Sequence, residues 1–138
     1  MPNQRGFTLI EILVAVIVLA VGLLGLAGLQ TAALKYTSTA YQRSQATSLA
    51  YDIADRMRAN VIAARAGDYN IAMGAIAPAG TTLAATDLQE WRQAQANTLP
   101  LGTGSIAQNG NVFTITIQWD DDRDPATPVL QFQTATAL

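Results

Sequence analysis

The most constraining feature of the sequence is a single carboxylate at the start of a long apolar run. Glu11 is followed by residues 12–29, eighteen positions that carry no polar side chain. A run of about 18 or more apolar residues is long enough to span a bilayer as a helix. A carboxylate near the bilayer centre, however, costs roughly 2.5–3.5 kcal/mol. We therefore expect a membrane-spanning helix whose acidic residue requires a partner.

The residues before the apolar run predict its orientation. Residues 1–6 form a short, polar segment, and Arg5 is the only charged side chain among them. Because cytoplasmic flanks are enriched in Lys and Arg, we expect a cytoplasmic N-terminus and a translocated C-terminal part. A cleaved secretory signal and a plain signal anchor are both compatible with this topology. Neither gives Glu11 a role.

Residues 6–11 read Gly-Phe-Thr-Leu-Ile-Glu. Followed by an apolar helix, this segment resembles the class III leader of type IV pilins and of the related type II secretion pseudopilins. The resemblance implies that a membrane prepilin peptidase and methyltransferase cuts between Gly6 and Phe7 and N-methylates Phe7. It further implies that Glu11 pairs with the N-terminal amine of a neighbouring subunit in the filament. Phe7 and Glu11 are four residues apart, which in a helix places them on one face.

Composition argues against an enzyme and against a nucleic-acid-binding surface. The chain has no cysteine and no histidine, and its formal net charge is −2. It therefore lacks thiolate and imidazole groups, the commonest zinc ligands and general base. We expect no catalytic residue, no metal site and no cofactor. A basic cluster, Arg43, Arg56, Arg58 and Arg65, gives weak support to DNA binding, because no aromatic residues alternate with its last three members.

The helix is expected to continue well beyond the apolar run. Apolar residues recur at three- and four-residue steps, which predicts one helix from Phe7 to about Arg65 with an amphipathic second half. That stripe comprises Ala46, Leu49, Ala50, Ile53, Ala54, Met57 and Val61. Asp52 and Arg56 are spaced for an ion pair, and we expect the charged face of this helix to be solvated.

The remaining residues predict a small head with a connecting loop, a short helix and a sheet. Thr86 or Asp87 is the expected N-cap of the helix, Trp91 its core residue, and Pro100 lies beyond its end. Asn109-Gly110 predicts a type I′ hairpin turn. The residues Phe113, Ile115, Ile117 and Trp119 alternate with polar ones, as in a strand with one buried face. Leu130 and Phe132 begin a second such strand.

An acidic segment lies between these strands. Asp120, Asp122 and Asp124 alternate like the first ligands of an EF-hand loop, but Pro125 occupies the position where that loop needs glycine. We therefore expect a solvated turn rather than a calcium site.

Two further segments narrow the resemblance. Residues 21–30 read Val-Gly-Leu-Leu-Gly-Leu-Ala-Gly-Leu-Gln, and residues 55–60 read Asp-Arg-Met-Arg-Ala-Asn. Together with the leader they resemble the PilV family of minor type IV pilins. The resemblance implies an α+β, type IV pilin-like fold in which a long N-terminal helix packs on a small antiparallel sheet. Its expected divisions are a leader at 1–6, a membrane or filament-core helix at 7–33, its amphipathic continuation at 34–66 and a head at 67–138.

The resemblance also implies a function. It describes a minor pilin that takes part in priming and tip assembly of type IV pili, and so in twitching motility and presentation of a tip adhesin. Its partners would be the prepilin peptidase, other minor pilins, the major pilin and a tip adhesin, with no nucleic acid. Before assembly it would lie in the inner membrane with a periplasmic head, and afterwards in the pilus. A minor pseudopilin of type II secretion, and a DNA-uptake or adhesion pilin, are the alternatives.

Overall fold

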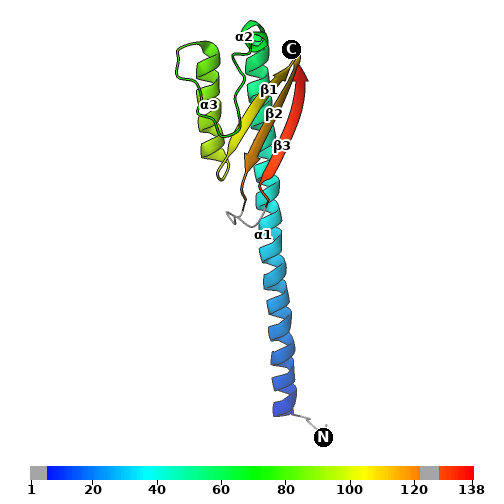
Figure 1. Cartoon of the computed structure of the whole chain (residues 1–138). Helices are drawn as coiled ribbons and strands as arrows, with labels where there is room; N and C mark the ends of the chain where they lie inside the picture. The colour runs from blue at the N-terminus through cyan, green and yellow to red at the C-terminus, as the bar shows by residue number, and fades with distance from the viewer. Residues whose placement is uncertain (1–5, 122–127) are drawn as a thin grey trace. The chain divides into compact units, whose positions relative to one another are not determined.

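The computed structural model describes residues 6–121 and 128–138. The chain divides into two compact units, Met1–Ser38 and Thr39–Leu138, each described by itself below. The elements along the chain are α1 (Leu9–Ala59), α2 (Val61–Ala66), α3 (Leu83–Thr98), β1 (Thr103–Asn109), β2 (Val112–Trp119) and β3 (Leu130–Ala137) (Figure 1). A long helix and a three-stranded sheet of order β1-β2-β3 confirm the predicted α+β, type IV pilin-like fold.

In the first unit, the described part of α1 is exposed along its length. By length and composition α1 is the one described helix that is long and apolar enough to cross a membrane, and none of its most apolar stretch is buried. The hydroxyls of Thr31 and Thr37 donate to the carbonyl oxygens of Ala27 and Ala33, at 3.0 and 2.9 Å. These bonds satisfy the two hydroxyls within the helix itself, which lowers the cost of an apolar environment.

The long helix does not continue unbroken to Arg65. It ends at Ala59, and Asn60 adopts φ −123° and ψ 51° before α2 begins. The Asn60 side chain donates to the Tyr69 hydroxyl at 3.2 Å. Asparagine is a weak helix former because its side chain forms hydrogen bonds in non-helical conformations. Here the bond to Tyr69 stabilises the non-helical conformation of Asn60.

Helix α3 begins earlier than predicted. Thr82 is the N-cap, and its hydroxyl accepts from the Ala85 amide at 3.2 Å. The prediction of Thr86 or Asp87 as the cap is therefore wrong. Asp87 is instead a buried residue of the second turn, where it contacts Arg56 and Tyr69.

The hairpin between β1 and β2 also differs in detail from the prediction. Asn109 pairs with Val112, so the two turn residues are Gly110 and Asn111. Gly110 has φ 61°, whereas among the described non-glycine residues only Leu101 has a positive φ. A type I′ turn needs positive φ at both central positions, and type II′ only at the first. The turn therefore has the type II′ pattern, shifted by one residue from the predicted one.

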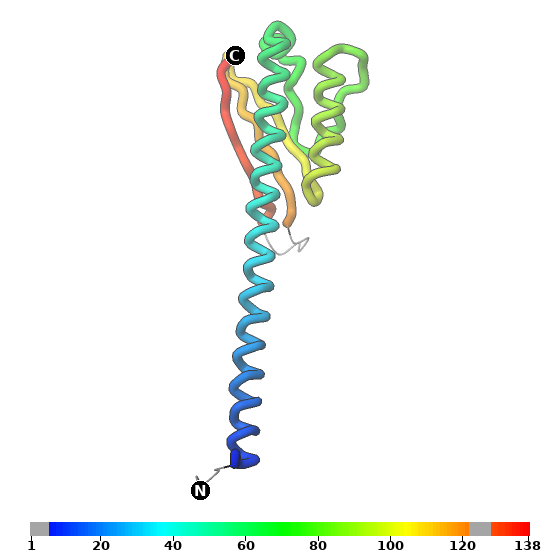
Figure 2. Tube along the Cα trace, turned by 180° about the vertical axis from the view of Figure 1, so that it is seen from behind, coloured from blue at the N-terminus to red at the C-terminus, as the bar shows by residue number. Residues whose placement is uncertain are grey.

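The core of the second unit lies between the sheet and the carboxyl-terminal part of α1, which Figures 1 and 2 show from opposite sides. The predicted helix stripe and the predicted strand face meet there. The buried members are Ala46, Ala50, Ile53, Ala54 and Met57 from α1, and Phe113, Ile115, Ile117 and Trp119 from β2. As predicted, Trp91 is a core residue. Its indole donates to the carbonyl oxygen of Leu49 at 3.0 Å, which fixes α3 to α1.

Gly104 marks the closest approach of β1 to α3. A Cβ at this position would lie 2.6 Å from Gln95 Nε2 and 2.8 Å from the Trp91 ring. Both of those side chains are fully or nearly fully buried. Only glycine therefore allows the strand and the helix to pack at this distance.

We predict that Gly104→Ala lowers the free energy of unfolding by about 1–3 kcal/mol, the usual cost of overpacking. Urea unfolding of the full chain in detergent, followed by the fluorescence of its two buried tryptophans, measures this loss. Gly80→Ala is the matched control, because its Cβ would meet only the Ala85 side chain at 3.4 Å. Equal stabilities of the two variants would contradict the packing argument.

Arg56 of α1 contacts three carboxylates, two of which belong to α3. Its guanidinium contacts Asp52 at 3.0 Å, Asp87 at 3.1 Å and Glu90 at 2.6 Å. The pKa of Arg56 is raised, chiefly by the hydrogen bond to Glu90, against an opposing effect of burial. The predicted pair with Asp52 is thus present, but Arg56 is a tertiary link rather than part of a purely solvated face.

Tyr69 extends this group of polar residues into the core. It is fully buried and its hydroxyl donates to Asp87 Oδ2. Burial, followed by the hydrogen bond to Asp87, raises the pKa of Tyr69 from 10.0 to about 12. Because the folded state favours the neutral phenol, the resulting stability is present below pH 10 and is lost as the pH rises through about 12.

We predict that Tyr69→Phe lowers the free energy of unfolding at neutral pH by about 1–2 kcal/mol, since one Asp87 oxygen loses its buried donor. Above pH 10 the gap between wild type and variant should narrow, because ionisation of Tyr69 destabilises only the wild type. Urea unfolding at a series of pH values up to 12 tests both statements. A gap that stays constant over this range would show that Tyr69 is not titrating as inferred.

Candidate assembly site at the start of helix α1

The bond between Gly6 and Phe7 lies outside the helix. Helix α1 begins at Leu9, and residues 6–8 before it have no regular structure. The Thr8 carbonyl accepts from the amides of Glu11 and Ile12 at 3.1 and 3.3 Å, and the Thr8 hydroxyl lies 3.4 Å from the Glu11 amide. Thr8 therefore caps the first turn. The predicted helix start at Phe7 is two residues too early, and this leaves Gly6 and Phe7 exposed on an irregular segment.

Glu11 lies in the first turn of α1. A negative charge there is favoured by the helix dipole, by about 0.3–1 kcal/mol at an exposed site. Its side chain is exposed, and no ion pair to it is found within residues 6–121 and 128–138. The dipole compensates only part of the cost of placing this carboxylate in an apolar phase.

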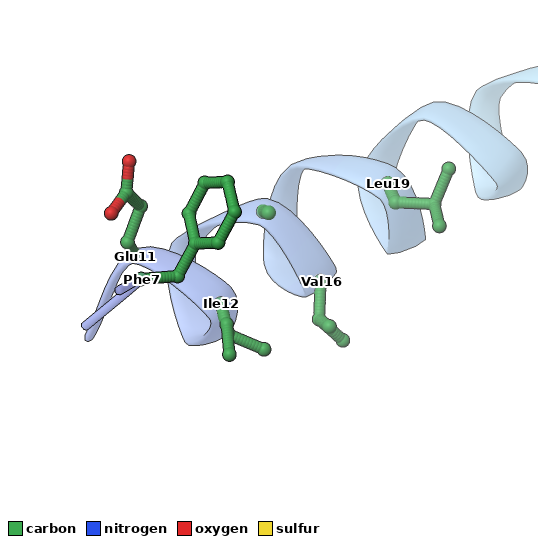
Figure 3. Close-up of a pocket in the computed structure, with 6 residues that line it drawn as sticks. Phe7, Glu11, Ile12, Val16 and Leu19 are labelled. Atoms are coloured by element: carbon green, nitrogen blue, oxygen red, sulfur yellow. The ribbon is translucent and has the colours of Figure 1, made fainter. Parts of the chain in front are cut away.

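Phe7 and Glu11 share one shallow groove along the helix surface. Figure 3 shows the Phe7 ring beside the Glu11 side chain, with Ile12, Val16 and Leu19 following along the helix. Ala15 completes the lining. Phe7 itself is 81% exposed. The groove, called the amino-terminal groove below, is therefore an apolar surface with one carboxylate at its end.

The chemistry of the groove suits helix packing rather than catalysis. Its apolar side chains complement another apolar helix, and its carboxylate can accept hydrogen bonds from a cationic group. An amine brought to Glu11 in an apolar setting would form a charge-assisted pair that holds only in one axial position. Among the described residues that line the groove, Glu11 is the one titratable side chain.

Two of the four arginines of the predicted basic cluster have acidic partners. Arg56 binds three carboxylates as described, and Arg58 pairs with Asp55. These contacts reduce the positive potential available to a phosphate backbone. The interhelical partners of Arg56 were missed from the sequence, although Asp87 and Glu90 are three residues apart and so share one face of α3.

The acidic segment lies partly outside the described residues, which end at Asp121 and resume at residue 128. The Asp120 amide donates to the Pro100 carbonyl at 3.0 Å, and Thr39 donates to Asp121 at 3.2 Å. Asp122, Asp124 and Pro125 are not described. Among the described residues, no group of three or more acidic side chains is placed to hold a metal ion.

Comparison with known proteins gives two family matches that adjoin along the chain. Residues 1–27 match the family described as the prokaryotic N-terminal methylation motif. Residues 28–88 match the family described as type IV pilin Tt1218. Searches of the curated proteins and of the solved structures found no match.

The methylation motif implies processing by a prepilin peptidase, and the single apolar helix near the N-terminus fits anchoring in the inner membrane. With an exposed, capped first turn, one carboxylate in an apolar groove and these two matches, the chain is a type IV pilin-like protein.

Proposed function

We propose that the chain is a minor pilin that is cut between Gly6 and Phe7, N-methylated at Phe7 and then incorporated into the priming and tip complex of a type IV pilus. The observation that carries this proposal is the amino-terminal groove, where Glu11 lies beside Phe7 without an ion pair among the described residues. A new amine at Phe7 of a neighbouring subunit is the cation that this carboxylate lacks.

The irregular segment before α1 supports the cleavage step. A peptidase needs an accessible, non-helical bond, and the Gly6–Phe7 bond lies before the capped first turn. The proposed leader is residues 1–6, and the proposed filament-core helix is residues 7–33. Residues 34–66 and 67–138 then form the helical continuation and the head.

The apolar side chains of the groove support the assembly step. Before assembly they face lipid, and in a filament they would face the helices of neighbouring subunits, which are equally apolar. Moving between these phases costs little hydrophobic energy, so the charge pair at Glu11 supplies the difference that favours the filament. Before assembly, the subunit would lie in the inner membrane with a cytoplasmic N-terminus and a periplasmic head.

The assignment to a PilV-type minor pilin rests on the segments at 21–30 and 55–60. Arg56, in the second segment, joins α1 to α3. The head has no cysteine, so packing and these polar contacts stabilise it without a disulfide. Such a head suits a subunit present in few copies, which would contact other minor pilins, the major pilin and a tip adhesin and would support twitching motility and adhesion.

We predict that the chain extracted from membranes begins at Phe7 and carries one additional methyl group on its N-terminal amine. Gly6→Leu should abolish this start, because a large side chain would occupy the residue next to the scissile bond. Gly28→Leu is the matched control within the same helix, and it should leave the start at Phe7 unchanged. N-terminal mass spectrometry measures all three proteins.

Two results would contradict the proposed function. A wild-type start near Gly28 or Leu29 would identify an ordinary secreted protein and overturn the proposal. If processing is correct, deletion of the chain should reduce the number of surface pili per cell. An unchanged number of pili, with loss of secreted enzymes instead, would assign it to type II secretion.

A further inference from the structure

The turn between β1 and β2 contains the one Asn-Gly pair of the sequence. Asn109 is the last residue of β1, and Gly110 is the first turn residue. Both residues are exposed. The space beside the Gly110 α-carbon is also open, since a Cβ there would meet no atom within 4 Å. The pair therefore lies at a solvent-accessible end of the hairpin.

The side-chain amide of Asn109 and the backbone amide of Gly110 are both free to react. Among the described residues, no hydrogen bond joins the Asn109 side chain or the Gly110 N–H to another group. Other groups of the turn are bound. The Gly110 carbonyl accepts from Gln108 Nε2 at 3.1 Å, and the Asn111 carbonyl accepts from the Leu138 amide at 2.9 Å.

We propose that Asn109 is a site of spontaneous deamidation. The Gly110 backbone nitrogen attacks Cγ of the Asn109 side chain, and the new C–N bond closes a cyclic imide. The bond from Cγ to Nδ2 breaks, and Nδ2 leaves as ammonia with the proton of the Gly110 amide. Water then adds to either carbonyl carbon of the imide and opens it to aspartate or isoaspartate. The reaction consumes water, releases ammonia and requires no oxidant, reductant or enzyme.

The glycine after Asn109 makes this asparagine more reactive than the others. A side chain on the following residue crowds the approach of its backbone nitrogen to Cγ, and glycine has none. The other asparagines of the described part of the chain precede β-branched residues, in the pairs Asn60-Val61, Asn70-Ile71, Asn97-Thr98 and Asn111-Val112. Asn111 is the best comparison, because it is exposed in the same turn.

The attack disturbs the native hairpin only at its end. The Asn109–Gly110 peptide must rotate, which breaks the pairing of Asn109 with Val112. This is the last pair of the ladder, and the core begins at the next pair, where Phe113 is fully buried opposite Gln108. Local openings of this kind cost much less free energy than global unfolding. The folded head can therefore react.

The isoaspartate product would alter a contact between the hairpin and α2. Its main chain runs through the former side-chain carbons Cβ and Cγ, so one additional carbon separates residues 109 and 110. This carbon moves the Gly110 carbonyl relative to Gln108 Nε2, which also donates to the Arg65 carbonyl of α2 at 3.2 Å. Deamidation should therefore loosen the end of the hairpin from α2.

Peptide mass spectrometry tests the proposal on the full chain, incubated in detergent in mildly alkaline buffer. It measures the loss of each side-chain amide with time. Asn109 should lose its amide about tenfold or more faster than Asn111. A protein isoaspartate methyltransferase should label the product. The assay uses the unassembled chain, so its result does not depend on the proposed function.

Two variants test the mechanism. Gly110→Asp adds a side chain next to the attacking nitrogen, and aspartate tolerates the positive φ of this position. Loss of the Asn109 amide should therefore slow about tenfold or more. Asn109→Gln is the matched control, because a glutamine amide would have to close a larger ring and should stay intact. Tryptophan fluorescence verifies that both variants keep the core.

Three results would overturn the proposal. They are equal rates at Asn109 and Asn111, an unchanged rate in Gly110→Asp, and loss of the Asn109 amide only in urea. Hydrogen exchange in residues 61–66 and 108–112 should be faster in the deamidated chain than in the intact one. Equal exchange would overturn the inferred effect on α2.

Discussion

The chain is organised around one carboxylate in an apolar helix. Glu11 lies in a capped first turn and precedes eighteen apolar residues, and it has no ion pair among the described residues. The helix dipole offsets only a fraction of the cost of this charge in lipid. The amino-terminal helix is therefore less stable alone in a membrane than beside a cation that pairs with Glu11. This difference in stability would favour assembly in one axial position.

The head uses a different kind of interaction to stay on α1. Without a disulfide, its stability comes from the buried faces of α1 and β2 and from a few polar contacts between helices. Arg56 binds carboxylates of α1 and α3, and Asp87 also accepts from Tyr69. Asp87 and Tyr69 are buried, so removing a partner of Asp87 leaves a buried carboxylate oxygen unsatisfied. These contacts therefore specify where α3 lies as well as stabilising it.

Features that depend on repeating patterns were predictable from the sequence. The strand alternation from Phe113 to Trp119 and the helical stripe from Ala46 to Met57 predict which side chains are buried, and both predictions are confirmed.

Features that depend on tertiary partners could not be predicted from the sequence. The helix break at Asn60 uses the Tyr69 hydroxyl, and the roles of Asp87 and Glu90 depend on the packing of α3 against α1. The hairpin signal was present, but register placed Gly110 rather than Asn109 at the first turn position. Gly6, Phe7 and Glu11 were identified from a motif, and the structure adds the exposure of all three residues and the groove that Phe7 and Glu11 share.

The central claim is that the negative charge of Glu11 drives assembly. A comparison of the variants Glu11→Gln and Glu11→Asp tests it most directly. Both variants keep the apolar helix, but only Asp keeps the carboxylate. The measurement is the fraction of processed chain recovered in sheared pili rather than in membranes. Breaking a buried charge pair costs about 3–5 kcal/mol, so Glu11→Gln should be cleaved normally yet lower this fraction by about a hundredfold or more, while Glu11→Asp retains a clear part of it. Recovery of Glu11→Gln in pili at the wild-type level would contradict the account.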